Sequence, residues 1–129
     1  METYSLYIHI PFCASKCTYC DFFSIPVGND FSLCEQTQRI FKDYILALKK
    51  ELEYYFKKFQ IKSLKTIYIG GGTPSLLSVG QIRELFDFIG SKLTIEENAE
   101  ITLEANPQDI SEKFLDELKK TPVNRLSLG

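Results

Sequence analysis

Three cysteines stand close together near the start of the chain, in the stretch FCASKCTYC that spans residues 12–20. Cys13, Cys17 and Cys20 are separated by three and then by two residues. A thiolate is a ligand for zinc and for iron–sulfur clusters, and it is also the reactive form of a redox cysteine. Three thiols on so short a stretch therefore predict a metal centre or a redox site.

Three kinds of site fit these thiols. A structural zinc ion takes four tetrahedral ligands, and His9 could add the fourth ligand to the three cysteines. A redox site would use the C-x-x-C motif of residues 17–20, but it would leave Cys13 without a role. An iron–sulfur cluster takes one cysteine per iron, so three cysteines on a [4Fe–4S] cluster would leave one iron open to a substrate or a cofactor.

The composition is that of a globular protein. The 129 residues are 44% hydrophobic and 25% charged, and the net charge is -2. No basic run predicts nucleic-acid binding, and no apolar stretch approaches the ~18 residues of a membrane span. The start of the sequence lacks the features of a signal peptide, which favours a cytoplasmic protein. In that compartment clustered cysteines are more often metal ligands or catalytic thiols than disulfides.

The hydrophobic pattern predicts strands that alternate with helices. Strands with one apolar face are expected at 4–10, 66–70, 100–105 and 124–129. Amphipathic helices are expected at 37–59, from a capping box at Ser78 to about Gly90, and from a cap at Ser111 through Lys120. A long connection is expected at 24–36. Strands joined by helical crossovers form a parallel sheet, so the predicted fold class is α/β.

The two faces of the predicted strands differ in polarity. A parallel sheet that is covered on both sides is normally apolar on both faces. Here one face is polar in all four strands: it carries Tyr7, His9, Tyr68, Gly70, Thr102, Glu104, Arg125 and Ser127. We expect the apolar face to pack on the helices and the polar face to line the lumen of a partial TIM-like (β/α) barrel; a solvent-exposed face is the alternative.

A closed barrel of this kind needs ~250 residues. Residues 1–129 are therefore expected to form the N-terminal part of an incomplete barrel, with about four strands and three helices. The final predicted strand has no helix after it to cover its apolar side, which would leave an unprotected sheet edge.

Two further segments hold candidate ligand-binding residues. The triple glycine of residues 70–72, followed by Thr73, comes directly after a strand, and it allows either a tight turn or close approach of the backbone to a ligand. Glu104 lies at the C-terminal end of the third strand, which is the end where barrel active sites lie. Its carboxylate can accept hydrogen bonds from hydroxyl or ammonium groups, and a surface glutamate is the structural alternative.

Several motifs together resemble the radical S-adenosylmethionine (SAM) superfamily. The signature is the CxxxCxxC pattern after the first strand of a β/α run, with an aromatic residue, Tyr19, before the last cysteine. In order and spacing, the stretches YIHIPFCASKCTYCDFFS, IYIGGGTPSLL, ITLEANPQ and VNRLSLG resemble the oxygen-independent coproporphyrinogen III oxidase family, which includes related heme chaperones. The oxidases proper have a further cysteine where this chain has Phe22, which favours the heme-chaperone branch.

The resemblance implies two cofactors and the residues that hold them. A [4Fe–4S] cluster would bind SAM at its open iron, and the reduced cluster would cleave SAM to a 5'-deoxyadenosyl radical. The implied cluster ligands are Cys13, Cys17 and Cys20, and the implied residues at or near SAM and the cluster are Tyr7, Tyr19, Gly71, Gly72, Thr73 and Glu104.

The resemblance also implies the ligand of the protein. In the chaperone branch heme is held and passed to acceptor proteins, whereas in the oxidase branch propionate side chains of coproporphyrinogen are decarboxylated to vinyl groups. A zinc-stabilised structural domain is the third hypothesis. We expect residues 1–129 alone to turn over no substrate. Cys34 is interpreted as a bystander thiol, and His9 and Arg125 as residues that either contact a ligand or have a structural partner.

Overall fold

The structure is a computed structural model, and it describes residues 3–13, 25–26 and 35–129. Four parallel strands form its central sheet, and each pairs with the next strand of the sheet along the chain. Their spatial order is β1 (Tyr4–Ile10), β4 (Ser63–Gly71), β5 (Thr94–Ala105) and β6 (Arg125–Leu128). The predicted α/β fold with a parallel sheet is confirmed.

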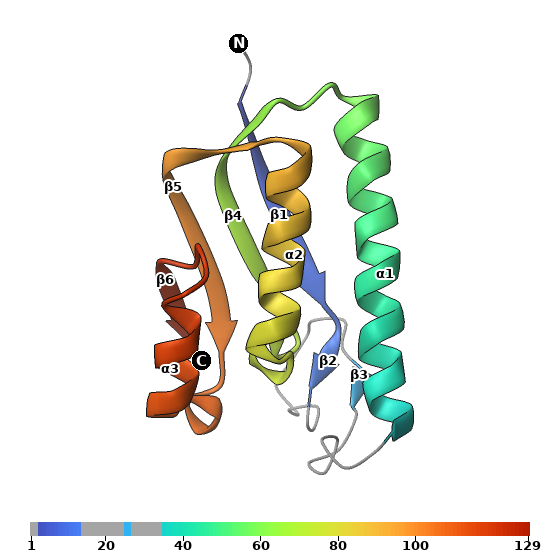
Figure 1. The fold of residues 1–129 in the computed structure, drawn as a ribbon. Helices are drawn as coiled ribbons and strands as arrows, with labels where there is room; N and C mark the ends of the chain where they lie inside the picture. The colour runs from blue at the N-terminus through green and yellow to red at the C-terminus, as the bar shows by residue number, and fades with distance from the viewer. Residues whose placement is uncertain (1–2, 14–24, 27–34) are drawn as a thin grey trace.

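Three helices connect the strands and lie on one face of the sheet (Figure 1). They are α1 (Glu35–Lys58), α2 (Val79–Lys92) and α3 (Glu112–Leu118), and short 3-10 turns, η2 (Pro74–Leu76) and η3 (Pro107–Asp109), follow β4 and β5. The capping box expected at Ser78 is present: the Gln81 N–H donates to the Ser78 hydroxyl, and the Ser78 N–H donates to the Gln81 side chain. Ser111 caps α3 by accepting from the Phe114 N–H.

The core lies between the helices and the apolar face of the sheet. Alternate strand residues point into it and are buried: Ile8, Ile10, Ile67, Ile69, Ile101 and Leu103. The helices contribute buried side chains at helical spacing, among them Phe41, Ile45, Ile82, Leu85 and Ile89. The expectation that the apolar strand face packs on the helices is confirmed.

The opposite face of the sheet is polar, as the alternation predicts. Tyr7 is 55% exposed there, whereas Thr102 is only 1% exposed because its neighbours on β4 and β6, Tyr68 and Arg125, flank it. In the ranges that the structure describes, no helix or strand covers this face. Its role as the lining of a lumen stays a prediction.

Several element boundaries differ from the sequence prediction. β4 begins at Ser63 rather than 66, and β5 begins at Thr94 rather than 100, because the two strands continue to pair beyond an irregularity in register between Leu64 and Thr66. α3 ends at Leu118 rather than Lys120, because Thr121 N–H bonds the Leu118 carbonyl and closes a turn. The remaining ends, those of α1, α2 and β6, differ from the prediction by a few residues at most.

Two very short strands were not predicted. β2 (Phe12–Cys13) and β3 (Ile25–Pro26) pair in parallel, with Phe12 opposite Ile25 and Cys13 opposite Pro26. The segment that contains Cys17 and Cys20 therefore begins and ends on neighbouring strands.

No helix in the described ranges is both long enough and apolar enough to cross a membrane.

Candidate functional site

The glycine-rich turn after β4 is fastened to the strand that leads into the cysteines. Gly72 N–H donates to the carbonyl of Ile10 at 2.7 Å, and Thr73 N–H donates to the carbonyl of Phe12 at 2.6 Å. Phe12 directly precedes Cys13. Two segments that the sequence singles out separately are therefore joined at the C-terminal ends of β1 and β4.

Gly71 has a backbone conformation that side chains rarely allow. Its φ is +115°, and a Cβ built on it would lie 2.7 Å from the Ile10 carbonyl oxygen and 2.8 Å from the His9 ring. The Gly71 N–H donates to Glu104 Oε1 at 3.0 Å. The turn itself thus requires glycine at this position, and contact of the turn with a ligand stays a prediction.

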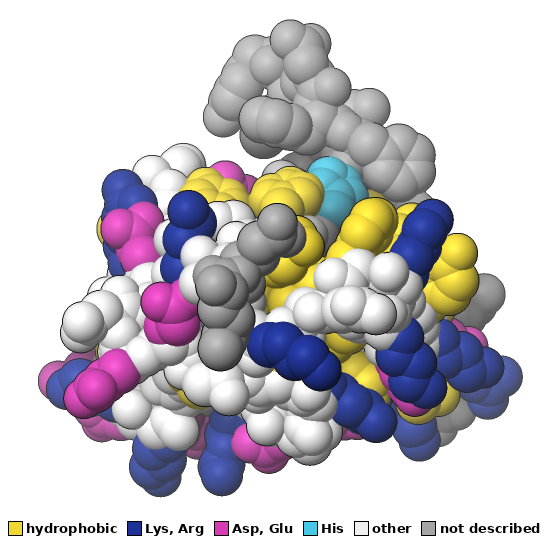
Figure 2. Space-filling view, turned by 90° about the horizontal axis from the view of Figure 1, so that it is seen from above, with side chains coloured by type: hydrophobic (Ala, Val, Ile, Leu, Met, Phe, Trp, Pro, Cys, Tyr) yellow, Lys and Arg dark blue, Asp and Glu magenta, His cyan; other side chains and the backbone are white. Residues whose placement is uncertain are grey.

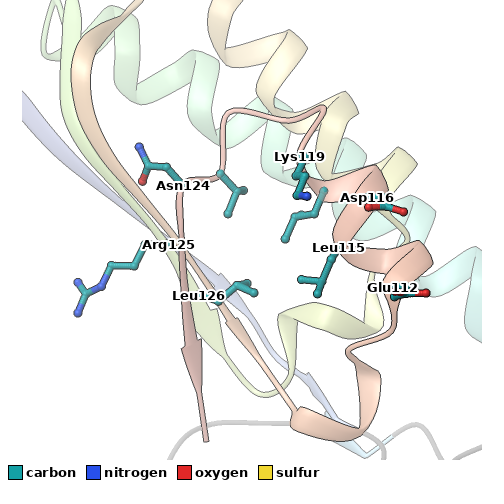
Figure 3. A pocket seen from close by; sticks show the side chains of 9 residues that line it. Glu112, Leu115, Asp116, Lys119, Asn124, Arg125 and Leu126 are labelled. Atoms are coloured by element: carbon teal, nitrogen blue, oxygen red, sulfur yellow. The ribbon is translucent and has the colours of Figure 1, made fainter.

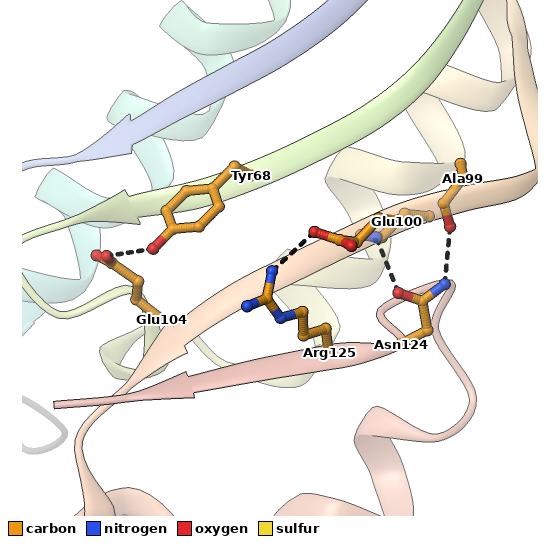
Figure 4. Close-up of polar contacts among 7 residues, drawn as sticks. Tyr68, Ala99, Glu100, Glu104, Asn124 and Arg125 are labelled. Atoms are coloured by element: carbon orange, nitrogen blue, oxygen red, sulfur yellow. Dashed lines mark hydrogen bonds and ion pairs between the residues drawn. The ribbon is translucent and has the colours of Figure 1, made fainter.

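Glu104 links β5 to β4 through both of its carboxylate oxygens. Its Oε1 accepts from Gly71 N–H, and its Oε2 accepts from the Tyr68 hydroxyl at 2.6 Å (Figure 4). The hydrogen bond to Glu104 and, to a smaller extent, burial raise the pKa of Tyr68, so the Tyr68 hydroxyl stays protonated and donates at neutral pH. A carboxylate oxygen can accept more than one hydrogen bond, so Glu104 keeps acceptor capacity for a ligand.

Tyr7 and His9 extend this polar group along β1. The ring of Tyr7 stacks on that of Tyr68 with centroids 6.0 Å apart and an interplanar angle of 22°. The Tyr7 hydroxyl lies 3.0 Å from Nδ1 of His9. Of the two roles expected for His9, ligand contact or a structural partner, the structure shows the structural partner. Burial and, to a smaller extent, the charge of Glu104 raise the pKa of Tyr7. Tyr7, Tyr68, Glu104 and the glycine turn therefore form one continuous polar edge.

A second contact joins the turns that follow β4 and β5. The Ser75 hydroxyl donates to Asp109 Oδ2 at 2.8 Å and accepts from the Asn106 N–H at 3.2 Å, and Ser75 is only 8% exposed. The contact holds the turn after Gly71 against the end of the strand that carries Glu104. This pair is not predictable from the sequence, because a serine and an aspartate in turns give no signal of long-range contact.

We expect Ser75→Ala to lower the free energy of unfolding by about 1–2 kcal/mol, because the partly buried Asn106 N–H loses its acceptor and Asp109 loses a donor. Denaturant unfolding measures the change. The control is Ser91→Ala, which removes an exposed hydroxyl that donates to the Phe88 carbonyl within α2. It should change stability by less than about 0.5 kcal/mol. Equal losses in the two variants would contradict the role given to Ser75.

Two roles were expected for Arg125, contact with a ligand or a structural ion pair, and the structure shows the ion pair. Its Nη1 lies 2.8 Å from Glu100 Oε1, and both side chains are exposed (Figure 4). The neighbouring Asn124 fixes the start of β6, because its side chain accepts from the Ile101 N–H and donates to the Ala99 carbonyl, each at 2.8 Å.

Several predicted residues cannot be placed in this site. Cys13 ends β2, and its position beside the glycine turn follows from the hydrogen bond of Phe12. The cluster ligand set and the role of Tyr19 stay predictions. The residues that lie outside the described ranges are Cys17, Tyr19, Cys20, Phe22 and Cys34.

A groove runs between β1 and α1 and reaches the polar edge. Its volume is about 490 Å³, and Tyr7, His9 and Tyr44 line it near that edge. The Tyr44 hydroxyl donates to the His9 carbonyl, a contact that the sequence does not reveal because Tyr44 fits the apolar stripe of a helix. At its other end Tyr55 and Phe59 line the groove. The face where the strands begin shows hydrophobic side chains between Lys and Arg side chains (Figure 2).

A second hollow, of about 530 Å³, lies between α3 and β6 (Figure 3). Leu115 and Leu126 point into it, and Lys119 and Glu112 stand at its α3 side. It lies on the helix-covered face of the sheet, so it is separate from the polar edge that holds Glu104.

The fold and this edge define an α/β protein with parallel (β/α) units and with its polar residues at the C-terminal ends of the strands. The chain belongs to the radical SAM superfamily, whose sequence model matches residues 7–129. Coproporphyrinogen III oxidase (HemN) from Escherichia coli, described as a radical SAM enzyme, has a similar structure: the TM-score is 0.82 and the identity 31%. The similarity covers 98% of this chain and 27% of that one. Membership implies a [4Fe–4S] cluster and SAM.

Proteins named heme chaperone HemW are similar in sequence over 97% of this chain. The identity is 42% over 125 residues with the protein from Lactococcus lactis, 41% over 126 residues with that from Escherichia coli, and 43% over 126 residues with that from Bacillus subtilis. The chain spans only 30–31% of the length of these relatives.

Proposed function

We propose that this chain is the cluster-binding and SAM-binding part of a radical SAM protein that binds heme and transfers it to acceptor proteins. The observation that carries the proposal lies at the C-terminal ends of the strands. There the glycine turn donates hydrogen bonds to Glu104 and to the segment leading to Cys13. The similarity to proteins named heme chaperone HemW supports the heme part of the proposal.

The described residues fit SAM by their chemistry. SAM carries an ammonium group and ribose hydroxyls, which are donors, and Glu104 is a fixed acceptor at the edge where Cys13 begins the cysteine segment. A reduced cluster with bound SAM supplies one-electron cleavage of the sulfonium, and the protein supplies binding and orientation. The proposed cluster ligands are Cys13, Cys17 and Cys20, with Tyr19 beside the cluster, and the proposed SAM contacts are Tyr7, Gly71, Gly72, Thr73 and Glu104.

The residues of this edge have separate roles in the proposal. Glu104 accepts hydrogen bonds from SAM, and carbonyl groups of the glycine turn accept from its amino group. Tyr7, which is more than half exposed, forms one side wall of the proposed SAM site. A cytoplasmic location is part of the proposal, because a reducing compartment keeps the cysteine thiols free to bind the cluster.

Oxygen-independent coproporphyrinogen III oxidase is the second candidate function. The structural similarity to the enzyme from Escherichia coli supports it. Phe22, which stands where the oxidases have a further cysteine, favours the heme chaperone.

The two candidates differ in what they do with a tetrapyrrole. The whole radical SAM protein of which this chain is proposed to be a part is purified anaerobically, reconstituted with iron and sulfide, titrated with heme, and separately incubated with coproporphyrinogen III, SAM and a reductant. We expect saturable heme absorbance at about one heme per chain and no release of carbon dioxide. Decarboxylation without heme binding would contradict the proposal and support the oxidase.

A further inference from the structure

We infer that Tyr68 is a positioning residue for SAM binding, because its hydroxyl fixes the carboxylate of Glu104 in the orientation that receives SAM. The inference rests on the proposed function, in which Glu104 contacts SAM.

Two donors from different directions hold the Glu104 carboxylate. The Gly71 N–H lies 3.0 Å from Oε1, and the Tyr68 hydroxyl oxygen lies 2.6 Å from Oε2. A glutamate side chain that is held at one oxygen can still turn about that contact, whereas one held at both oxygens has a defined plane. Hydrogen bonds to a carboxylate are also about twice as strong as neutral ones. Tyr68 therefore supplies the second point that sets the plane.

Tyr68 is itself held in place. On β4 it stands opposite Thr102, and Glu104 is two residues further along β5 on the same face, so the pair is a diagonal cross-strand contact. The Tyr68 ring stacks on that of Tyr7. A Cβ built on Gly70 would lie 2.8 Å from both the Tyr68 ring and Glu104 Oε1. The first glycine of the turn thus leaves the space that this contact occupies.

The hydroxyl remains protonated over the range in which SAM binding is measured. The hydrogen bond to Glu104 and, to a smaller extent, burial raise the pKa of Tyr68 above its usual value of 10.0, so the hydroxyl loses its proton only in strong alkali. At neutral pH the contact therefore has one fixed direction, with Tyr68 as donor and Glu104 as acceptor.

A double-mutant cycle tests the inference in the reconstituted protein. SAM affinity is measured for the unsubstituted protein, Tyr68→Phe, Glu104→Ala and the double variant. Tyr68→Phe keeps the ring and removes only the hydroxyl, and it should weaken SAM binding roughly 5- to 10-fold. Glu104→Ala removes the side chain that Tyr68 holds, and it should weaken SAM binding roughly 10- to 100-fold. Because Tyr68 acts through Glu104, the double variant should bind SAM as Glu104→Ala does, within about twofold.

The control is Tyr54→Phe, which removes the hydroxyl of a tyrosine that is 58% exposed on α1, and it should leave SAM affinity unchanged. If Tyr68→Phe binds SAM normally while Glu104→Ala does not, the inference is wrong and the proposed function stands. If the two effects multiply in the double variant, Tyr68 acts independently of Glu104 and the inference is also wrong. If the unsubstituted protein binds no SAM, both the proposed function and the inference fail.

Discussion

Gly71→Ala is expected to lower the free energy of unfolding by about 2–4 kcal/mol. Its φ of +115° strains any residue with a Cβ, and the added Cβ would press on the Ile10 carbonyl at 2.7 Å. That carbonyl accepts the hydrogen bond of Gly72, so relief of the collision would separate β1 from the glycine turn. Denaturant unfolding measures the loss, and iron content after reconstitution should fall as well.

Gly90→Ala is the matched control for this prediction. Gly90 lies in α2, and apart from its chain neighbours and the backbone of its own helix no atom lies within 4 Å of a Cβ built on it. Alanine is the better helix former, so this variant should be more stable by about 0.5–1 kcal/mol. A Gly71→Ala variant as stable as the unsubstituted protein would show that the turn does not have the described conformation.

Phe12→Ala is expected to lower the free energy of unfolding by about 3–5 kcal/mol. Phe12 is 3% exposed, and its ring centroid lies 4.9 Å from that of Phe41 and 5.2 Å from that of Tyr44. These contacts fasten the residue before Cys13 to α1. Loss of the ring would therefore leave a cavity and also release the start of the cysteine segment. Thermal and denaturant unfolding measure the stability.

Phe59→Ala is the control for Phe12→Ala. Phe59 is 50% exposed and directly follows α1, so the same truncation should cost no more than about 1 kcal/mol. If the two variants lost the same stability, Phe12 would not be the anchor that the structure indicates.

The order of strands and helices could be predicted because periodicity and burial agree along the sequence. The alternation of Leu6, Ile8 and Ile10 identifies β1, and Ser78 with Gln81 identifies the start of α2. The end of α1 carries a weaker signal: Gln60 has a φ of 50°, where such an end usually has glycine, and Ile61 N–H bonds the Phe56 carbonyl.

The length of β5 could not be predicted from local propensity. Its first half, TIEENA, contains residues that are rare in strands, such as Glu and Asn. Pairing with β4 nonetheless extends the strand back to Thr94, opposite Ser63. Tertiary pairing thus overrides local preference, and only the apolar half, from Ile101, is evident in the sequence.

Only part of the candidate site could be predicted, because some of its residues carry a local signal in the sequence and others depend on distant partners. Glu104 and the glycine turn stand out because residue type and position at a strand end both indicate a site, and the structure joins them. Tyr68 and Ser75 do not stand out, because their roles depend on partners more than thirty residues away in the chain. Such contacts depend on strand register, which the sequence pattern does not reveal.

The most direct test of the central claim is the iron content and SAM response of single cysteine variants. Cys13→Ala, Cys17→Ala and Cys20→Ala are compared with Cys34→Ala after anaerobic reconstitution. We expect about four iron and four sulfide per chain, and a spectrum that shifts on addition of SAM, in the unsubstituted protein and in Cys34→Ala. We expect loss of both in the other three variants. Full iron content and an unchanged SAM response in any of those three, or one zinc ion without sulfide in the unsubstituted protein, would contradict the proposed cluster site.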